Sequence, residues 1–235
     1  MPAAFLPTPP PYVQSRTTRA PLTVTRQPPT FLTASTGPPS INNASDALES
    51  THCTLPLLTP SLLAAHAGFL VACYSDHPLV SALKLLTSKP VTGIFEASLS
   101  ASLLLIGPEQ GFGIVSTGKI WEELLGNGVG KYLGAEASRR FVGCETTGLN
   151  ATDLHDVPVE EVREKMKEAT KRLLRKGNVG AVCLGCAGMA GMDEMVREAC
   201  VEELGEEEGR KVRVVDGVKV GFAMLEGLIQ ADSVN

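Results

Sequence analysis

The chain has 235 residues, of which 43% are apolar and 20% charged, and it carries a formal net charge of −5 with a pI near 5.5. This composition permits a packed core, and the acidic charge disfavours nucleic acid or a membrane as a partner. No apolar run approaches the roughly 20 residues that cross a bilayer, and no secretory signal opens the chain. We therefore expect a cytoplasmic location.

The N-terminal part differs in composition from the rest. Residues 1–45 hold ten of the sixteen prolines, three arginines and no acidic residue. Because each proline removes a backbone donor, we predict that residues 1–29 form an irregular Pro-rich segment. A mitochondrial transit peptide is also basic and rich in serine, but it forms an amphipathic helix that these prolines oppose, so we favour it less.

From residue 30 onward, short β-type runs alternate with helical patterns. The predicted strands are residues 30–34, 68–73, 111–116, 139–143, 179–184 and 212–215. Several are almost uninterrupted apolar segments, as strands covered on both faces tend to be. Strands that alternate with helices predict an α/β fold with parallel sheets flanked by helices.

Three helices are indicated between and after these strands. The first passes through residues 79–86, and we expect Asp76 to cap it. The clearest extends from about Pro158 to Lys176, with apolar residues at spacings of three and four, and the last covers about residues 216–231. The acidic run at residues 202–209 is interpreted as a solvated helix end and loop.

The six cysteines are predicted to be free thiols, because a chain of this size builds its core without bridges and shows no secretion signal. They are Cys53, Cys73, Cys144, Cys183, Cys186 and Cys200. The pair Cys183 and Cys186 forms a Cys-x-x-Cys motif, which is found in redox pairs and in half of a zinc site. No second Cys or His pair lies at a usual spacing, so we favour neither.

Two of the cysteines stand where a predicted strand ends. Cys73 follows the run at residues 68–72 and Cys186 follows the run at 179–184, in similar settings that suggest a duplicated half. Ligands of parallel sheets bind at the carboxyl ends of strands. We expect a helix N-terminus beside each thiol to lower its pKa from about 8.5 and make it a base at neutral pH.

Two thiols on opposite sides of a carbon acid suffice to invert its configuration, because one thiolate removes the proton and the opposite thiol supplies another. This chemistry needs no cofactor. The sequence contains no phosphate-binding loop, glycine fingerprint in the required context or metal-ligand quartet. We therefore predict neither a cofactor nor a metal.

Five segments resemble, in order, motifs of the aspartate/glutamate/hydantoin racemase superfamily, in particular its hydantoin and allantoin racemase branch. They are residues 33–41, 72–76, 93–97, 115–118 and 184–189. The resemblance implies two pseudo-symmetric lobes, each a mainly parallel sheet flanked by helices, with the active site in the cleft between them. We expect the first lobe to hold residues 30–95 plus 216–235, and the second to hold residues 96–215.

The resemblance also implies a function. Cys73 and Cys186 correspond to the two acid/base residues of a cofactor-independent racemase, and Thr117, Ala187 and Gly188 fall in segments that resemble its substrate-contacting loops. We expect a small-molecule substrate, with a hydantoin-type ring such as allantoin or a 5-substituted hydantoin favoured over free aspartate or glutamate. The ring carbon next to an imide loses its proton more readily than the α-carbon of a zwitterion.

One departure from the family lies at the N-terminus. Related chains begin with a short apolar strand and an Asn-Pro-Asn-Thr type loop that lines the site, and residues 1–29 contain no match to it. The alternative function is therefore a non-catalytic or degenerate ligand-binding member of the family. The side chain of the substrate does not follow from the sequence, and a homo-oligomer stays open.

Overall fold

The structure is a computed structural model that describes residues 28–135 and 138–232. Apart from Pro28 and Pro29, the predicted irregular segment lies outside these residues. The chain divides into two compact units, residues 1–32 and 33–235. All helices and strands of the described residues belong to the second unit.

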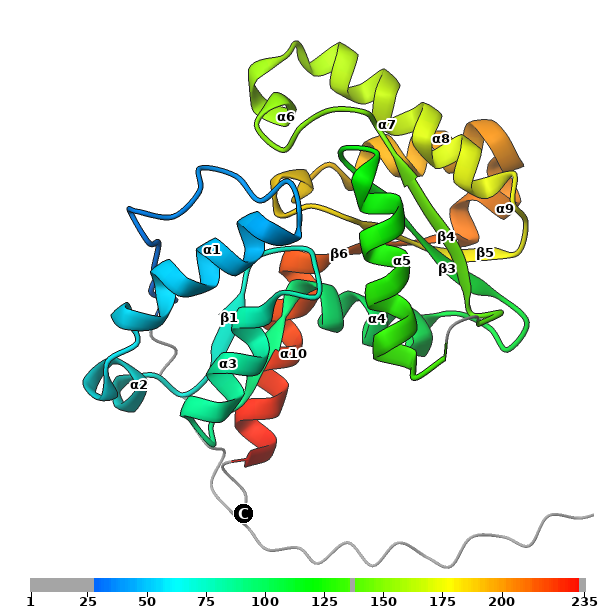
Figure 1. Ribbon diagram of the computed structural model, residues 1–235. Helices are drawn as coiled ribbons and strands as arrows, with labels where there is room; N and C mark the ends of the chain where they lie inside the picture. Colours follow the sequence, from blue (N-terminus) through cyan, green and yellow to red (C-terminus); the bar gives the residue numbers. More distant parts are fainter. Residues whose placement is uncertain (1–27, 136–137, 233–235) are drawn as a thin grey trace, which may run out of the picture. The chain divides into compact units, whose positions relative to one another are not determined.

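The described strands form two parallel sheets (Figure 1). The smaller sheet pairs β1 (Phe69–Val71) with β2 (Val91–Gly93). The larger sheet has the order β4-β3-β5-β6, with β3 at Gly111–Ser116, β4 at Phe141–Thr146, β5 at Val179–Leu184 and β6 at Arg213–Asp216. Every pairing is parallel, and helices flank both sheets, which confirms the predicted fold class.

The helices cover these sheets in chain order. They are α1 (Ala44–Thr54), η1 (Leu55–Leu57), α2 (Pro60–Ala65), α3 (Pro78–Leu86), α4 (Ile94–Leu105), α5 (Ile120–Leu133), α6 (Asp153–Asp156), α7 (Val159–Leu174), η2 (Ala187–Met189), α8 (Asp193–Leu204), α9 (Glu206–Lys211) and α10 (Gly217–Asp232). Among the described residues, no helix combines the length and the apolar character that a membrane span requires.

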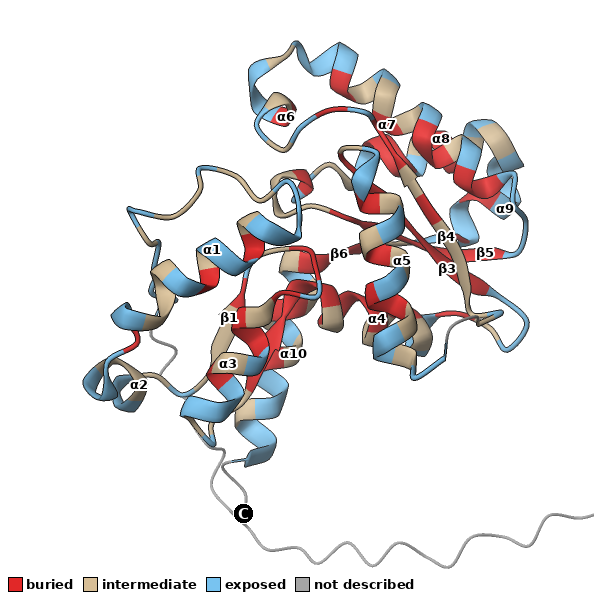
Figure 2. Cartoon of the chain, viewed as in Figure 1, coloured by how far each residue is buried: buried red, intermediate tan, exposed pale blue. Residues whose placement is uncertain are grey.

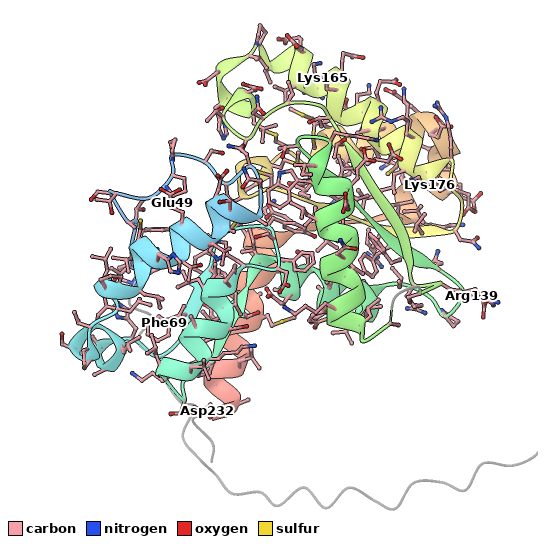
Figure 3. The ribbon with its side chains drawn as sticks, in the orientation of Figure 1. Glu49, Phe69, Arg139, Lys165, Lys176 and Asp232 are labelled. Atoms are coloured by element: carbon pink, nitrogen blue, oxygen red, sulfur yellow. The ribbon has the colours of Figure 1, made fainter. Side chains whose placement is uncertain are left out.

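Helices lie on both faces of the larger sheet because side chains along a strand alternate between its faces. On β5, Val182 and Leu184 pack with α7 and α8, whereas Ala181 and Cys183 pack with α4 and α5. Figure 2 shows the resulting buried layer along the strands and the inner sides of these helices. The outer side of α7 is charged, and Figure 3 places Lys165 there, within 3.7 Å of Glu161.

The helices α4 and α10 connect the two sheets. Helix α4 begins where β2 ends and contacts β5 and β6 of the larger sheet. Helix α10 begins where β6 ends and packs against α4 and β1 (Figure 1). The carboxyl ends of β1 and β5, where the two candidate thiols follow, therefore belong to sheets that share these helices.

Two predicted strands differ from the structure. Residues 30–34 form no strand: Pro28 and Pro29 precede them, and the Phe31 side chain is 82% exposed, so extended pairing there would bury little apolar surface. The strand predicted at residues 139–143 lies two to three residues later, as β4. The short strand β2 was not predicted, since three residues after a proline carry no clear period-2 pattern.

Two helix-end predictions were also wrong. Asp76 does not cap α3, because His77 is the N-cap and its ring accepts a hydrogen bond from the Leu79 amide at 3.2 Å. Residues 202–209 are more helical than expected, since the glutamates after Gly205 begin α9. Their i,i+3 and i,i+4 pairing with the basic residues at the end of α9 favours that helix.

Candidate active site

Each of the two predicted thiols follows the carboxyl end of a parallel strand. Cys73 lies two residues beyond β1 and packs, partly buried, against the apolar core of the smaller sheet. Cys186 lies two residues beyond β5 and is likewise partly buried. The charge of Cys186 is one of the smaller causes that raise the pKa of Cys73.

The Cys73 thiol is held in its protonated form. Burial is the largest cause that raises its pKa from an ordinary 9.0 to about 11, and the negative charges of Cys186 and Glu96 add to it. Ser75 opposes them, because its hydroxyl lies 3.4 Å from the sulfur and a hydrogen bond to the thiolate lowers the pKa. At neutral pH, Cys73 is therefore a proton donor.

The Cys186 thiol has a different environment. Cys186 is the N-cap of η2, and the backbone amides of Gly188 and Met189 stabilise its thiolate. Burial is the larger effect and raises the pKa of Cys186 above 9.0. Among the groups that act on Cys186, the two amides favour the thiolate, so Cys186 is better equipped than Cys73 to become a base.

The prediction that helix N-termini lower both pKa values was wrong for two reasons. Helix α3 begins only at Pro78, five residues after Cys73, so its first amides serve His77 instead. The second helix, η2, has three residues, and its amides do not outweigh the loss of water around the sulfur. Burial is a tertiary property that the local sequence does not display.

Glu96 supplies the fixed negative charge near Cys73. It lies in the first turn of α4, where the backbone amides of Glu96 and Gly93 favour its carboxylate. Burial and the nearby Asp76 raise its pKa, and burial is the larger cause. Its Oε2 atom is buried and accepts no hydrogen bond from the described residues. This oxygen lies against the Gly93 backbone, so the carboxylate folds back onto the start of its own helix.

The predicted substrate-contacting residues follow neighbouring strands. Thr117 is buried directly after β3, and because Val115 pairs with Leu184, it lies at the same sheet edge as Cys186. Its carbonyl accepts a hydrogen bond from the Gly148 amide at 3.0 Å. Ala187 and Gly188 are partly exposed in η2.

Gly188 has close neighbours from α6. A Cβ atom at this position would lie 3.1 Å from a Leu154 methyl and 3.5 Å from the His155 Nε2 atom. His155 is exposed, and it borders the loop that carries Cys186. No local sequence signal connects the two segments.

Three residues that the sequence did not single out hold the Cys186 loop. Gly185 donates its amide to the Val115 carbonyl at 2.7 Å and accepts the Ser116 hydroxyl on its own carbonyl at 2.7 Å. Asp216 is buried at the end of β6 and accepts the Gly191 amide at 3.1 Å, beyond η2. Asp216 also accepts two amides of α10, so one carboxylate joins that helix to the Cys186 loop.

The remaining cysteines have core environments or lie elsewhere. Cys183 is fully buried with its sulfur 3.1 Å from the Ser102 hydroxyl, Cys144 and Cys200 are buried, and Cys53 is in α1. Because Cys183 packs in the core beneath β5, whereas Cys186 lies beyond the strand, the pair does not have the common exposed face of a metal knuckle. The described residues contain no group of three or more metal-ligating side chains.

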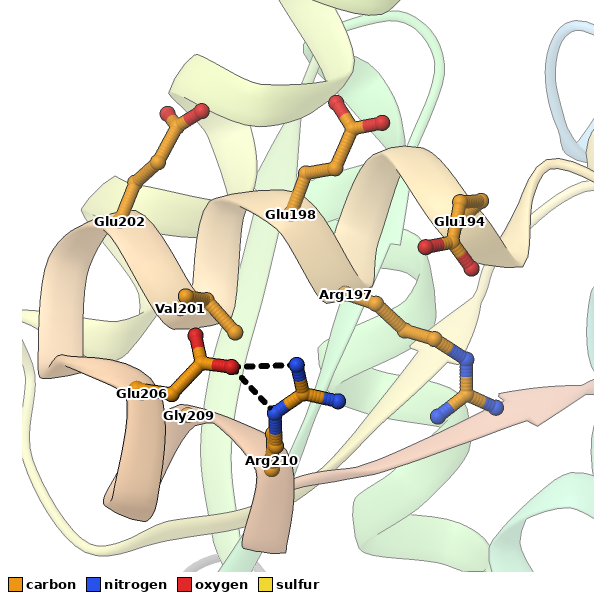
Figure 4. Close-up of a pocket in the computed structure, with 8 residues that line it drawn as sticks. All are labelled: Glu194, Arg197, Glu198, Val201, Glu202, Glu206, Gly209 and Arg210. Carbon is orange, nitrogen blue, oxygen red and sulfur yellow. Dashed lines mark hydrogen bonds and ion pairs between the residues drawn. The ribbon is translucent and has the colours of Figure 1, made fainter.

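A cavity of about 400 Å³ lies between α8 and α9 and contains none of the predicted site residues (Figure 4). Its charged side chains pair with one another or with α7: Arg210 with Glu206, Glu198 with Arg163, and Glu202 with Lys167. These pairs neutralise the walls, and no nucleophile faces the space. We therefore place the candidate site at the two thiols and not in this cavity.

Comparisons with known proteins relate the chain to racemases. The profile described as Asp/Glu/Hydantoin racemase matches residues 15–225. An uncharacterised protein of Schizosaccharomyces pombe is 32% identical over 194 residues, which are 83% of this chain and 76% of that protein. A hydantoin racemase of a Pseudomonas species is 29% identical over 69% of this chain and 58% of its own length. The allantoin racemase of Pseudomonas fluorescens shares the fold, with a TM-score of 0.70 at 24% identity over 86% of this chain and 78% of that one.

Proposed function

The chain belongs to the Asp/Glu/hydantoin racemase family, and from that premise we propose that it racemises a hydantoin-type ring such as allantoin or a 5-substituted hydantoin. The observation that carries the proposal is the pair of partly buried thiols, Cys73 and Cys186, each two residues beyond the carboxyl end of a parallel strand. We place the substrate between them, in a cleft between a lobe of residues 30–95 plus 216–235 and a lobe of residues 96–215.

The two thiols have different roles in the resting enzyme. Cys186 acts as the base: burial raises its pKa above 9.0, and the Gly188 and Met189 amides stabilise the fraction that ionises. Cys73 stays protonated, because Glu96 and burial oppose its ionisation. The Cys186 thiolate removes the proton from the ring carbon, and the Cys73 thiol donates its proton to the opposite face. The ring carbon is inverted, and the charge has moved from one sulfur to the other.

The cycle closes when the proton returns from Cys186 to Cys73, through solvent or through the reverse reaction on the opposite enantiomer. Carbanion charge spreads onto the neighbouring carbonyl oxygen, where backbone amides of the Thr117, Ala187 and Gly188 segments act as donors. Sulfur and backbone groups supply every proton and charge in this sequence. The reaction we propose therefore runs without a cofactor.

A neutral ring fits the charges better than a free amino acid does. The carboxylate that acts on Cys73 is Glu96, whose charge raises the pKa of that thiol. The same carboxylate repels the α-carboxylate of aspartate or glutamate. We accordingly propose a ureide-type ring with N–H donors, handled by a cytoplasmic enzyme of nitrogen metabolism.

The test follows the optical rotation of one enantiomer of allantoin or of a 5-substituted hydantoin with purified protein. Racemisation makes the rotation decay to zero faster than in buffer alone, and Cys73→Ala and Cys186→Ala each abolish the enzymatic decay. Cys53→Ala, at a thiol in α1, is the matched control and keeps the decay. In deuterated water, each single variant exchanges the ring proton of one enantiomer without inverting it, as expected when the remaining thiol serves only one face.

The alternative, a degenerate binding member, predicts a different result. Such a protein binds the ring without any decay of optical rotation, and neither cysteine substitution changes that. The sequence feature that favours this alternative is that residues 1–29 do not resemble the short apolar strand and Asn-Pro-Asn-Thr type loop of related chains, although the family profile matches from residue 15. Calorimetric binding measured beside polarimetry separates the two functions.

A further inference from the structure

The loop that carries Cys73 is embedded in the core of the larger sheet. Tyr74 is next to Cys73, yet it does not share the apolar cluster of Val71 and Leu79 against which Cys73 packs. Its ring is 4% exposed and belongs to the cluster of α4, α5 and β5. Consecutive residues of one loop therefore pack in two different cores.

The Tyr74 ring is tightly enclosed on several sides. It meets Phe95 of α4 edge-on, with ring centroids 5.5 Å apart and planes at 81°. A Cβ atom at Gly217, the first residue of α10, would lie 3.2 Å from the Tyr74 ring, so that side has no spare room. The hydroxyl points toward Ser98 and Cys183, which affect its pKa, but it forms no hydrogen bond of normal geometry among the described residues.

A second contact fixes the other end of the same loop. The Asp76 carboxylate accepts a hydrogen bond from Lys131 Nζ of α5 at 2.8 Å. The Cβ atom of Asp76 also lies against Gly128, one turn earlier in that helix, where an added Cβ would be 3.4 Å away. Helix α5 packs on the larger sheet, so Asp76 joins the Cys73 loop to the body that carries Cys186.

We propose that Tyr74 and Asp76 are positioning residues that set the distance between the two thiols. Tyr74 packs in the same core cluster as Cys183 of β5, three residues before Cys186, and Asp76 reaches α5. Together they tie the Cys73 loop to the larger sheet at two points. Neither side chain needs to touch substrate for this role.

The proposal has a specific structural consequence. A two-thiol exchange requires one sulfur on each face of a small ring, and a misplacement of about 1 Å costs on the order of a hundredfold in rate. The ring of Tyr74 provides the packing, whereas its unpaired hydroxyl contributes no hydrogen bond. Tyr74→Phe therefore preserves the position of Cys73, and Tyr74→Leu releases it.

The experiment measures the separation of the thiols without substrate. A short bifunctional thiol reagent, dibromobimane, is reacted with the full chain, and the Cys73–Cys186 bridged peptide is quantified by mass spectrometry. We expect Tyr74→Leu to lower both the bridge yield and kcat, kcat by tenfold or more, at a KM within about twofold of the wild type. Tyr74→Phe rescues both. Tyr132→Leu, at an exposed tyrosine of α5, is the matched control.

Asp76→Asn is a second variant. Because the Asp76 side chain is exposed, we expect this substitution to leave the folding of the protein unchanged. We expect a two- to fivefold lower bridge yield, and high salt reproduces that loss in the wild type because it screens the Lys131 pair. The proposal is overturned if Tyr74→Leu and Asp76→Asn give the same bridge yield as the wild type. It is also overturned if kcat falls while the bridge yield stays unchanged. If Tyr74→Leu does not fold, Tyr74→Met, whose unbranched and flexible side chain adapts to the space of the ring, takes its place.

The inference rests on the proposed function in treating the two thiols as the reacting groups. The two fail separately, however. If the bridge yield depends on Tyr74 but the protein has no racemase activity, the proposed function is refuted and the positioning role is retained. If the protein is active but the bridge yield does not depend on Tyr74, the positioning role is refuted and the proposed function is retained.

Discussion

The titration of Cys73 is the most direct test of the electrostatics. With a pKa of about 11 in place of 9.0, about 0.1% of the thiol is ionised at pH 8, compared with about 10% of an unperturbed group. Two neighbours act on this thiol with opposite signs: the Ser75 hydroxyl lowers its pKa and the Glu96 carboxylate raises it. Ser75→Ala should therefore raise the pKa of Cys73, and Glu96→Gln should lower it.

The size of each change follows from a single interaction. A hydrogen bond to a charged group is worth about 1.5 kcal/mol, which corresponds to about one pH unit. We expect a midpoint near 12 for Ser75→Ala and a change of about one unit in the opposite direction for Glu96→Gln. Ser75→Ala thus makes the Cys73 thiolate about tenfold scarcer at any pH below 10.

The assay follows alkylation of Cys73 by iodoacetamide as a function of pH, with peptide mass spectrometry to resolve it from the other thiols. Ser81→Ala and Glu123→Gln, at exposed positions of α3 and α5, are the matched controls and leave the midpoint unchanged. The reasoning is refuted if both test variants move the midpoint in the same direction. A wild-type midpoint near 9 refutes it as well, because burial would then have no effect.

Three further predictions concern the framework of the site. Gly185→Ala brings a Cβ atom within 2.8 Å of the Val115 carbonyl oxygen. It should lower kcat, and it should lower the free energy of unfolding in a denaturant titration by about 1–3 kcal/mol. The control Gly126→Ala places its methyl group in open space and should stabilise α5 by about 0.5–1 kcal/mol in the same titration. Asp216→Ala leaves the Gly191 amide unpaired and removes a helix cap, at a cost of about 1–3 kcal/mol read from the same curves, and kcat falls with it. Because burial raises the pKa of several thiols above 9.0, the folded state keeps protons that the unfolded chain loses. These thiols therefore lower Tm between about pH 9 and 11, and a flat Tm over that interval contradicts the assignment.

The sequence predicts the parts of the fold that depend on local pattern. The strands at residues 111–116 and 179–184 are apolar throughout and have the predicted bounds, because both of their faces are covered. The long amphipathic helix α7 likewise differs from its prediction by two residues or fewer at each end. The strand predicted at residues 30–34 is absent because an apolar run becomes a strand only when a partner buries it, and the sequence alone does not show the partner.

The residues of the candidate site also fall into those that the local sequence pattern predicts and those that it does not. Cys73 and Cys186 stand out in the sequence because each follows an apolar run, whereas Tyr74, Gly185 and Asp216 carry no local signal for their contacts. Tyr74 packs with α4 and α5, and Asp216 binds the amide of a residue 25 positions earlier. Contacts of this range are set by topology, so they become visible only when the sheets are assembled.

The raised pKa values also affect how a racemase of this design would work. A thiol that ionises rarely gives a thiolate that is a stronger base, and in general acid–base catalysis the lower population is partly offset by the greater driving force for proton removal. A buried thiol with a pKa of about 11 is better matched to a weak carbon acid than a thiol with a pKa of 9, provided that the pKa of the partner thiol is also raised. Burial raises the pKa of both sulfurs, so whichever thiol loses its proton becomes a strong base, and this is what an enzyme needs if it is to turn over both enantiomers.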